Sequence, residues 1–243
     1  MLLNAGTRIA GISTTAGNGD ADETYRSARA EFGRLSIHRG GPGSDCDNAA
    51  IATLSAALTE QRLTILALGP LTNIAILLTC HPELTGRIAR IITVAGRLPG
   101  EKLALGQSRG SQLRDLNYET DRRSFHTVLQ SGVPVSLAPF AAGNAIRLGY
   151  GDLTDLPPRL RDRAWSWALI LWFAGGGGTL PAFDPAAAGL LLWPDLYRCD
   201  AVSVQAGHDL VLPPVVPPEE SRIRRCVPRD PSRLHRAMRR WLF

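Results

Sequence analysis

Two short apolar runs, joined by a loop and an apolar helix, dominate the middle of the chain. Leu63 to Leu68 and Arg90 to Ala95 are nearly unbroken apolar segments, the pattern of buried parallel strands. Between them, Gly69-Pro70 ends the first strand, and Asn73 to Leu78 predicts a helix that His81-Pro82 closes. A strand, a helix and a second strand over about thirty residues predict a right-handed βαβ unit.

The same alternation extends to both sides of this unit and predicts one α/β domain over residues 1–243. Further strands are expected at Thr7–Ser13, Leu35–His38 and Val133–Ala138, and helices at Asp22–Phe32, from Asp47 or Asn48 to Leu58, from Asp121 to Gln130, over most of Asp155–Ala174, and after Pro185. A long loop is expected at Pro99–Asp115, and either a flexible lid or an irregular bend at Gly175–Gly178. The expected fold is a doubly wound, mostly parallel open sheet flanked by helices.

Composition narrows the class of protein. A chain of 243 residues with 44% apolar content can bury a sizeable core in one domain. Its longest apolar stretch, Ala164–Ala174, is too short to span a bilayer, so no membrane segment is expected. The four cysteines are scattered without paired spacing, so the sequence predicts neither a zinc site nor a disulfide framework. A cytoplasmic location is therefore expected.

The chain has a net charge of +5, and almost all of its positive charge comes from arginine, since Lys102 is the only lysine. Many of these arginines lie between Arg222 and Arg240. A basic terminal helix at about 230–243, started by Asp230-Pro231 and packed through Leu234, Met238 and Leu242, explains them. Nucleic-acid binding, which would weaken steeply with salt, is the least favoured function because aromatic interleaving and known motifs are missing.

Polar residues follow several of the expected strands. In an open parallel sheet, ligands bind outside the carboxyl ends of the strands. Thr14–Asn18 follows the first strand, Gly69–Asn73 the central one, and Asp115 and Asn117 end the long loop. Each has a structural alternative when taken singly: Asn18 as a turn residue, Thr72 as a first-turn residue, and Asp121 and Asp184 as helix caps.

Taken together, four motifs resemble the inosine-uridine preferring nucleoside hydrolase family. They are Thr14-Thr15-Ala16-Gly17-Asn18, Gly69-Pro70-Leu71-Thr72-Asn73, Arg114-Asp115-Leu116-Asn117 with Asp121 four residues on, and Phe183-Asp184-Pro185. Their order and spacing match the family over nearly the whole chain. The resemblance implies a calcium-dependent enzyme that hydrolyses the N-glycosidic bond of ribonucleosides and assembles as a homo-oligomer, a dimer or tetramer.

The resemblance also assigns roles to individual residues. Asp184 would bind calcium through its carboxylate and Thr72 through its backbone carbonyl, which suits a cation that takes six to eight oxygen ligands. Asn18, Asp115 and Asn117 would hydrogen-bond the ribose. In much of the family a glutamate stands at the position of Asp115, so the charge is kept with a shorter reach.

Two departures from the family bear on activity. The aspartate-rich motif D-x-D-x-x-x-D-D, which supplies most calcium carboxylates and the general base, is absent from the sequence. Phe183 stands where better-known members carry a histidine acid, and phenylalanine cannot donate a proton. We therefore expect an N-terminally truncated, divergent member that lacks the first central strand and has little or no activity. The alternative is a non-catalytic protein that binds a ribosyl ligand or serves in assembly.

Overall fold

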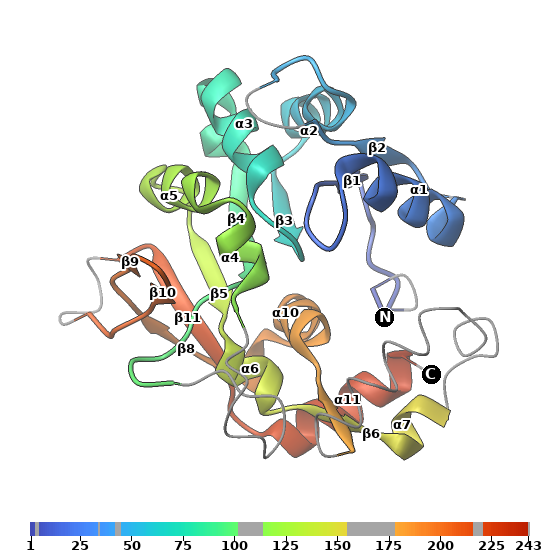
Figure 1. Ribbon diagram of the computed structural model, residues 1–243, viewed down its shortest axis with the longest axis vertical. Helices are drawn as coiled ribbons and strands as arrows, with labels where there is room; N and C mark the ends of the chain where they lie inside the picture. The colour runs from blue at the N-terminus through green and yellow to red at the C-terminus, as the bar shows by residue number, and fades with distance from the viewer. Residues whose placement is uncertain are drawn as a thin grey trace.

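A five-stranded sheet in the order β3-β4-β5-β11-β8 forms the centre of the fold (Figure 1). The computed structural model describes residues 1–2, 5–33, 35–41, 45–101, 114–154, 178–215 and 221–242. The strands are β3 (Leu63–Ala67), β4 (Ile88–Val94), β5 (Val135–Ala138), β11 (Ile223–Pro228) and β8 (Tyr197–Ala201). The first four are parallel and β8 is antiparallel to β11. The predicted mostly parallel α/β sheet is confirmed.

Helices cover both faces of this sheet. On one face lie α2 (Ala49–Glu60), α3 (Thr72–Cys80) and α5 (Arg122–Gln130), whose apolar side chains form one core cluster with Ile91 and Leu137. On the other face lie α6 (Phe140–Asn144), α10 (Phe183–Leu192) and α11 (Pro231–Leu242), which form a second cluster with Ile92 and Ala138. Alternate residues of β4 therefore face different clusters, as a doubly wound sheet requires.

The N-terminal elements form a separate unit. β1 (Ile12–Thr14) pairs in parallel with β2 (Ile37–Arg39), and α1 (Ala21–Phe32) lies against them, to the right of β3 in Figure 1. Among the described residues, no pairing joins β1 to β3. β3 is consequently an edge strand whose residues are only half-buried or exposed, although the sequence predicts a fully buried strand there. The expectation that this chain lacks the first central strand stays a prediction.

Shorter elements complete the described chain. They are η1 (Pro82–Arg87), α4 (Leu116–Thr120), β6 (Arg147–Gly149), α7 (Tyr150–Thr154), β7 (Thr179–Pro181), η2 (Pro194–Leu196), β9 (Gln205–Ala206) and β10 (Leu210–Val211). No helix in the described part of the chain has the length and hydropathy needed to cross a bilayer.

Element boundaries differ from the predictions mainly near the N-terminus. The first strand was expected at Thr7–Ser13, but β1 spans only Ile12–Thr14, because it pairs with the three residues of β2 alone. The helix over most of Asp155–Ala174 and the Gly175–Gly177 part of the glycine run lie outside the described residues, as does most of the Pro99–Asp115 loop. The basic terminal helix is present as α11, with Leu234 and Met238 fully buried.

The prediction of unpaired cysteines is wrong. Cys46 is bonded to Cys80, and Cys199 to Cys226, so no described cysteine is free. The second bridge joins directly opposite positions of β8 and β11. The paired cysteines are 34 and 27 residues apart and belong to no local motif, so the sequence carried no signal for them. The fold alone brings these positions together.

Candidate functional site

Asn117 lies across the carboxyl ends of two central strands. Its side-chain amide nitrogen donates to the Val94 carbonyl at 2.9 Å and, more weakly, to the Leu68 carbonyl at 3.5 Å. Val94 ends β4, and Leu68 directly follows β3. The amide oxygen of Asn117 accepts no hydrogen bond from the described residues, which leaves it available to a ligand hydroxyl.

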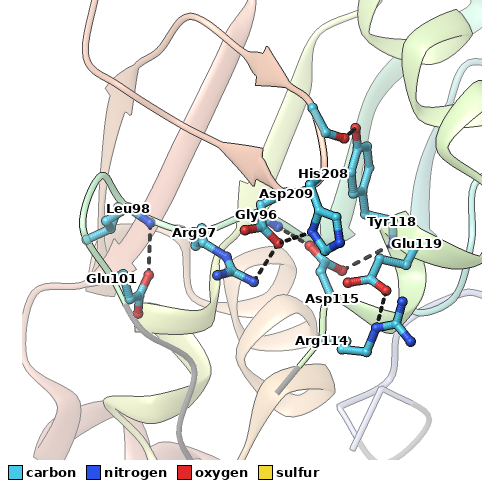
Figure 2. A network of polar contacts seen from close by, with 11 residues as sticks. Gly96, Arg97, Leu98, Glu101, Arg114, Asp115, Tyr118, Glu119, His208 and Asp209 are labelled. Carbon is cyan, nitrogen blue, oxygen red and sulfur yellow. Dashed lines mark hydrogen bonds and ion pairs between the residues drawn. The ribbon is translucent and has the colours of Figure 1, made fainter. Parts of the chain in front are cut away.

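Asp115 is committed to the backbone (Figure 2). It is the N-cap of α4, and its carboxylate accepts hydrogen bonds from the Gly96 amide at 2.7 Å and the Tyr118 amide at 3.1 Å. Only 3% of the residue is exposed, and this burial raises the pKa of its carboxyl, against the lowering effect of the two amides. Asp115 therefore fixes the loop after β4 and the start of α4, and any contact with a ligand would share these oxygens.

Thr72 begins α3 directly after the loop that follows β3. Its hydroxyl donates to Asp121 Oδ2 at 2.7 Å. Asp121 is also the N-cap of α5, accepting from the Ser124 amide at 3.0 Å, so the cap predicted from the sequence is confirmed. Burial would raise the pKa of Asp121, but the hydrogen bonds from Ser124 and Thr72 outweigh it and lower that pKa.

The turn that holds Asn18 touches the loop before Thr72. A β-carbon on Gly17 would lie 3.5 Å from Pro70 Cδ, and one on Gly69 would lie 3.3 Å from Thr15 Cγ2. Asn18 itself is exposed and lines an open depression with Glu23 and other residues at the start of α1. The carboxyl ends of β1 and β3 therefore meet through their loops, with Asn18 at the outer side of the contact.

Asp184 is an acidic residue without a partner. It lies in the first turn of α10, where the N-cap is Ala182 and no side chain caps the helix, so Asp184 is not the cap that its sequence context also allowed. Its carboxylate makes no hydrogen bond or ion pair with the described residues. The side chain is accessible to solvent, yet the surrounding protein raises its pKa to about 6 by desolvation.

Phe183 is a packing residue in this structure. Its ring meets the Phe140 ring edge-on, with centroids 5.0 Å apart, and lies directly against Gly143. A β-carbon at Gly143 would collide with the Phe183 ring, so the fit of α6 against α10 depends on this glycine. The position where the family resemblance places an acid is thus filled by an apolar contact.

Sequence reasoning missed one cluster of possible metal ligands. Glu119 of α4 and His208 and Asp209 of the β9–β10 turn bring their ligand atoms within 4.8 Å of one another. Figure 2 shows the same cluster held by arginines: Arg97 contacts Asp209 at 2.9 Å, and Arg114 contacts Glu119 at 2.5 Å. The two carboxylates already have cationic partners. No sequence signal joins these residues, because α4 and the turn are distant in the chain.

The structure links most of the predicted site residues at one edge of the sheet. Asn117 contacts the ends of β3 and β4, Thr72 follows β3, and the Asn18 turn contacts the loop that precedes Thr72. Asp184 arrives from a different element, α10, which packs on β4 and β5 from the other face. Oxygen donors and a carboxylate around strand ends suit a polar, hydroxyl-rich ligand and a hard cation.

Comparison with known proteins supports the resemblance to nucleoside hydrolases. The family model for inosine-uridine preferring nucleoside hydrolase matches residues 38–213. The pyrimidine-specific ribonucleoside hydrolase RihA of Escherichia coli is 29% identical over 157 residues, covering 57% of this chain and 45% of the relative. The aligned part thus spans less than half the length of that curated relative. RihA of Salmonella paratyphi A matches at the same identity and coverage.

Solved structures agree on the fold. A purine-preferring ribonucleoside hydrolase from Gardnerella vaginalis superposes with a TM-score of 0.77 at 16% identity, covering 99% of this chain and 93% of that one. The plant nucleoside hydrolase PpNRh1 gives 0.73 at 17% identity, with the same coverage. Since the family model matches well over half of the sequence, the chain belongs to the inosine-uridine preferring nucleoside hydrolase family.

Proposed function

We propose that this chain carries a ribonucleoside site at the carboxyl ends of β3 and β4, of the kind that hydrolyses the N-glycosidic bond. The observation that carries the proposal is the unpartnered carboxylate of Asp184, whose pKa is raised to about 6 and which lies within the part of the chain that the family model matches. A desolvated carboxylate without a counter-charge gains most from a cation, and perturbed acids of this kind gather at functional sites.

Calcium is the cation we propose, and the residues fit it in kind. Asp184 offers carboxylate oxygens without a competing partner, and the Thr72 carbonyl offers a second oxygen of the hard type that calcium prefers. These two residues would hold the ion, and water and the ribose diol would supply further oxygens. When bound, calcium polarises and orients the oxygens around it.

Asn117 and Asn18 are the proposed ribose contacts. Asn117 is fixed by its donation to Val94, so its free amide oxygen is presented in one orientation to a sugar hydroxyl. Asn18 is exposed on the neighbouring turn and can approach from the side of β1. Asp115 contributes by holding the start of α4. A ribose hydroxyl that binds its carboxylate would share oxygens that already accept from the amides of Gly96 and Tyr118.

Turnover by this chain is proposed to be slow or absent. Departure of the base is helped by a proton donor, and Phe183 offers none, being packed against Phe140. Binding of a ribonucleoside without efficient cleavage is therefore the expected behaviour, and a non-catalytic ribosyl-binding protein is the second candidate.

A reducing-sugar assay for ribose release tests this proposal. The purified chain is incubated with inosine or uridine, with and without calcium, beside Asp184→Ala. We expect release at or near background in every sample. A clear rate that needs calcium and disappears in Asp184→Ala would show that the proposed weakness is wrong, while confirming the site. A dimeric or tetrameric assembly remains a proposal, testable by light scattering on the purified chain. The cytoplasmic location was predicted from cysteines without a disulfide framework, and the two bridges remove that support.

A further inference from the structure

Asp121 uses its two carboxylate oxygens for different purposes. Oδ1 accepts the Ser124 amide at 3.0 Å and caps α5. Oδ2 accepts the Ser124 hydroxyl and the hydroxyl of Thr72, the latter at 2.7 Å from a residue 49 positions earlier in the chain. A helix cap needs only one acceptor oxygen. The bond to Thr72 is therefore additional to capping and joins the starts of α3 and α5.

Among the described residues, no side chain caps the start of α3, whose other polar tie is the Asn73 amide donating to the Thr14 carbonyl. The N-cap residue of α3 is Leu71, which cannot accept a hydrogen bond through its side chain. The hydroxyl of Thr72, half-buried, is tied to Asp121 instead. The rotation of the Thr72 peptide, and with it the direction of the loop after β3, is thereby coupled to the position of Asp121.

Asp121 also stands at the end of α4, the helix that carries Asn117. Asp121 is the C-cap of α4 and the N-cap of α5, so both helices turn at this residue. Asn117, four residues earlier, reaches the Val94 carbonyl at the end of β4. One carboxylate thus connects the segment proposed to bind the cation with the segment proposed to bind the ribose.

We propose that Asp121 is a positioning residue, which holds the Thr72 carbonyl and the Asn117 amide in the relative arrangement that the cation and the ribose require. This inference rests on the proposed function, because it assigns Asp121 to the same site. It touches neither ligand itself and acts through Thr72. Partners that orient metal ligands in this way typically change metal affinity by about 10-fold to 100-fold when removed.

Three variants separate positioning from helix capping. Thr72→Val removes the hydroxyl that donates to Asp121 and keeps the backbone carbonyl. Thr72→Ser keeps the hydroxyl and is the conservative rescue. Ser124→Ala removes the other hydroxyl on the same Asp121 oxygen and leaves the Thr72 bond in place, so it is the matched control. Calcium affinity is measured by isothermal titration calorimetry, and the free energy of unfolding by urea denaturation, for each variant and the unchanged chain.

We expect Thr72→Val to weaken calcium binding by about 10-fold or more, and Thr72→Ser and Ser124→Ala to stay within about 2-fold of the unchanged chain. Stability should fall to a similar extent in Thr72→Val and Ser124→Ala, since each loses one hydrogen bond to the same carboxylate. Equal calcium affinity in Thr72→Val and the unchanged chain would overturn the positioning role of Asp121 but not the proposed cation site. If the unchanged chain binds no calcium, the proposed cation site fails, and the positioning role falls with it.

Discussion

The side-chain amide of Asn73, in the first turn of α3, donates a hydrogen bond to the Thr14 carbonyl at the end of β1, at 2.9 Å. A second, longer contact of 3.3 Å reaches the Ser13 hydroxyl. Since β1 and β3 share no ladder in the described structure, this buried amide is a direct polar link between the N-terminal unit and the central sheet.

Replacing Asn73 by alanine should therefore destabilise the fold. The residue is only 6% exposed, so its loss leaves the interface with α3 short of a donor, at a cost of about 1–3 kcal/mol in the free energy of unfolding. Urea denaturation measures this. Thr59→Ala is the control, because its hydroxyl makes an exposed hydrogen bond to the Ser55 carbonyl within α2, and its loss should cost less than about 0.5 kcal/mol. Equal stability of the two variants would contradict the linking role of Asn73.

Gly40 offers an independent test of the same contact. A β-carbon at Gly40 would collide with the Thr14 carbonyl oxygen and with the Asn73 amide oxygen. Gly40→Ala should therefore cost about 1–3 kcal/mol through forced separation of β1 and α3. Gly86→Ala meets no atom within 4 Å and should be close to neutral. Comparable thermal midpoints for both variants would show that Gly40 packs less tightly against Thr14 and Asn73 than described.

The raised pKa of Asp184 predicts a pH dependence of stability. Its carboxyl has a pKa of about 6 when folded, against an ordinary value of 3.8, so the folded chain holds this proton more tightly than the unfolded chain. Its contribution is therefore most favourable below about pH 4 and declines as pH rises to about 6. Without calcium, Asp184→Asn should match the unchanged chain at pH 4 and exceed it in stability at pH 7.

Urea titrations at both pH values measure this difference. Asp195→Asn removes an exposed aspartate of η2 and controls for the change in net charge. Calcium at pH 7 should stabilise the unchanged chain and the Asp195→Asn variant but not Asp184→Asn. If Asp184→Asn and Asp195→Asn behave alike at all conditions, the carboxylate is not desolvated as described.

The two disulfides predict the reactivity of the cysteines. Titration of the unfolded, unreduced chain with a thiol reagent should detect no free thiol, and reduction should release all four cysteines. Each bridge closes a loop of about thirty residues and should contribute roughly 2–4 kcal/mol, so reduction should lower the midpoint of urea unfolding. Four reactive thiols before reduction would contradict the pairing of Cys46 with Cys80 and of Cys199 with Cys226.

Local signals predicted much of the fold. The apolar runs at Leu63–Leu68 and Arg90–Ala95 became the parallel pair β3 and β4, and Asp121 and Asn48 cap helices where their positions suggested. These features depend on residues close in sequence. The half-buried character of β3 was not predictable, because burial depends on which strand lies beside it and not on its own composition.

The site was predictable in its order along the chain but not in its bonding. Asn117 and Thr72 lie at strand ends as expected, whereas the commitment of Asp115 to the Gly96 and Tyr118 amides is visible only in three dimensions. The disulfides and the contact of Glu119 with the β9–β10 turn were missed for the same reason. Each joins residues whose spacing carries no periodic or motif signal.

Calorimetric titration of inosine and of uridine into the chain, with and without calcium, is the decisive test of the proposed ribonucleoside site. We expect binding that requires calcium, is lost in Asp184→Asn and is retained in Asp195→Asn. Ribonucleoside binding that is indifferent to calcium and to Asp184, or no binding under any of these conditions, would contradict a ribonucleoside site built around this carboxylate.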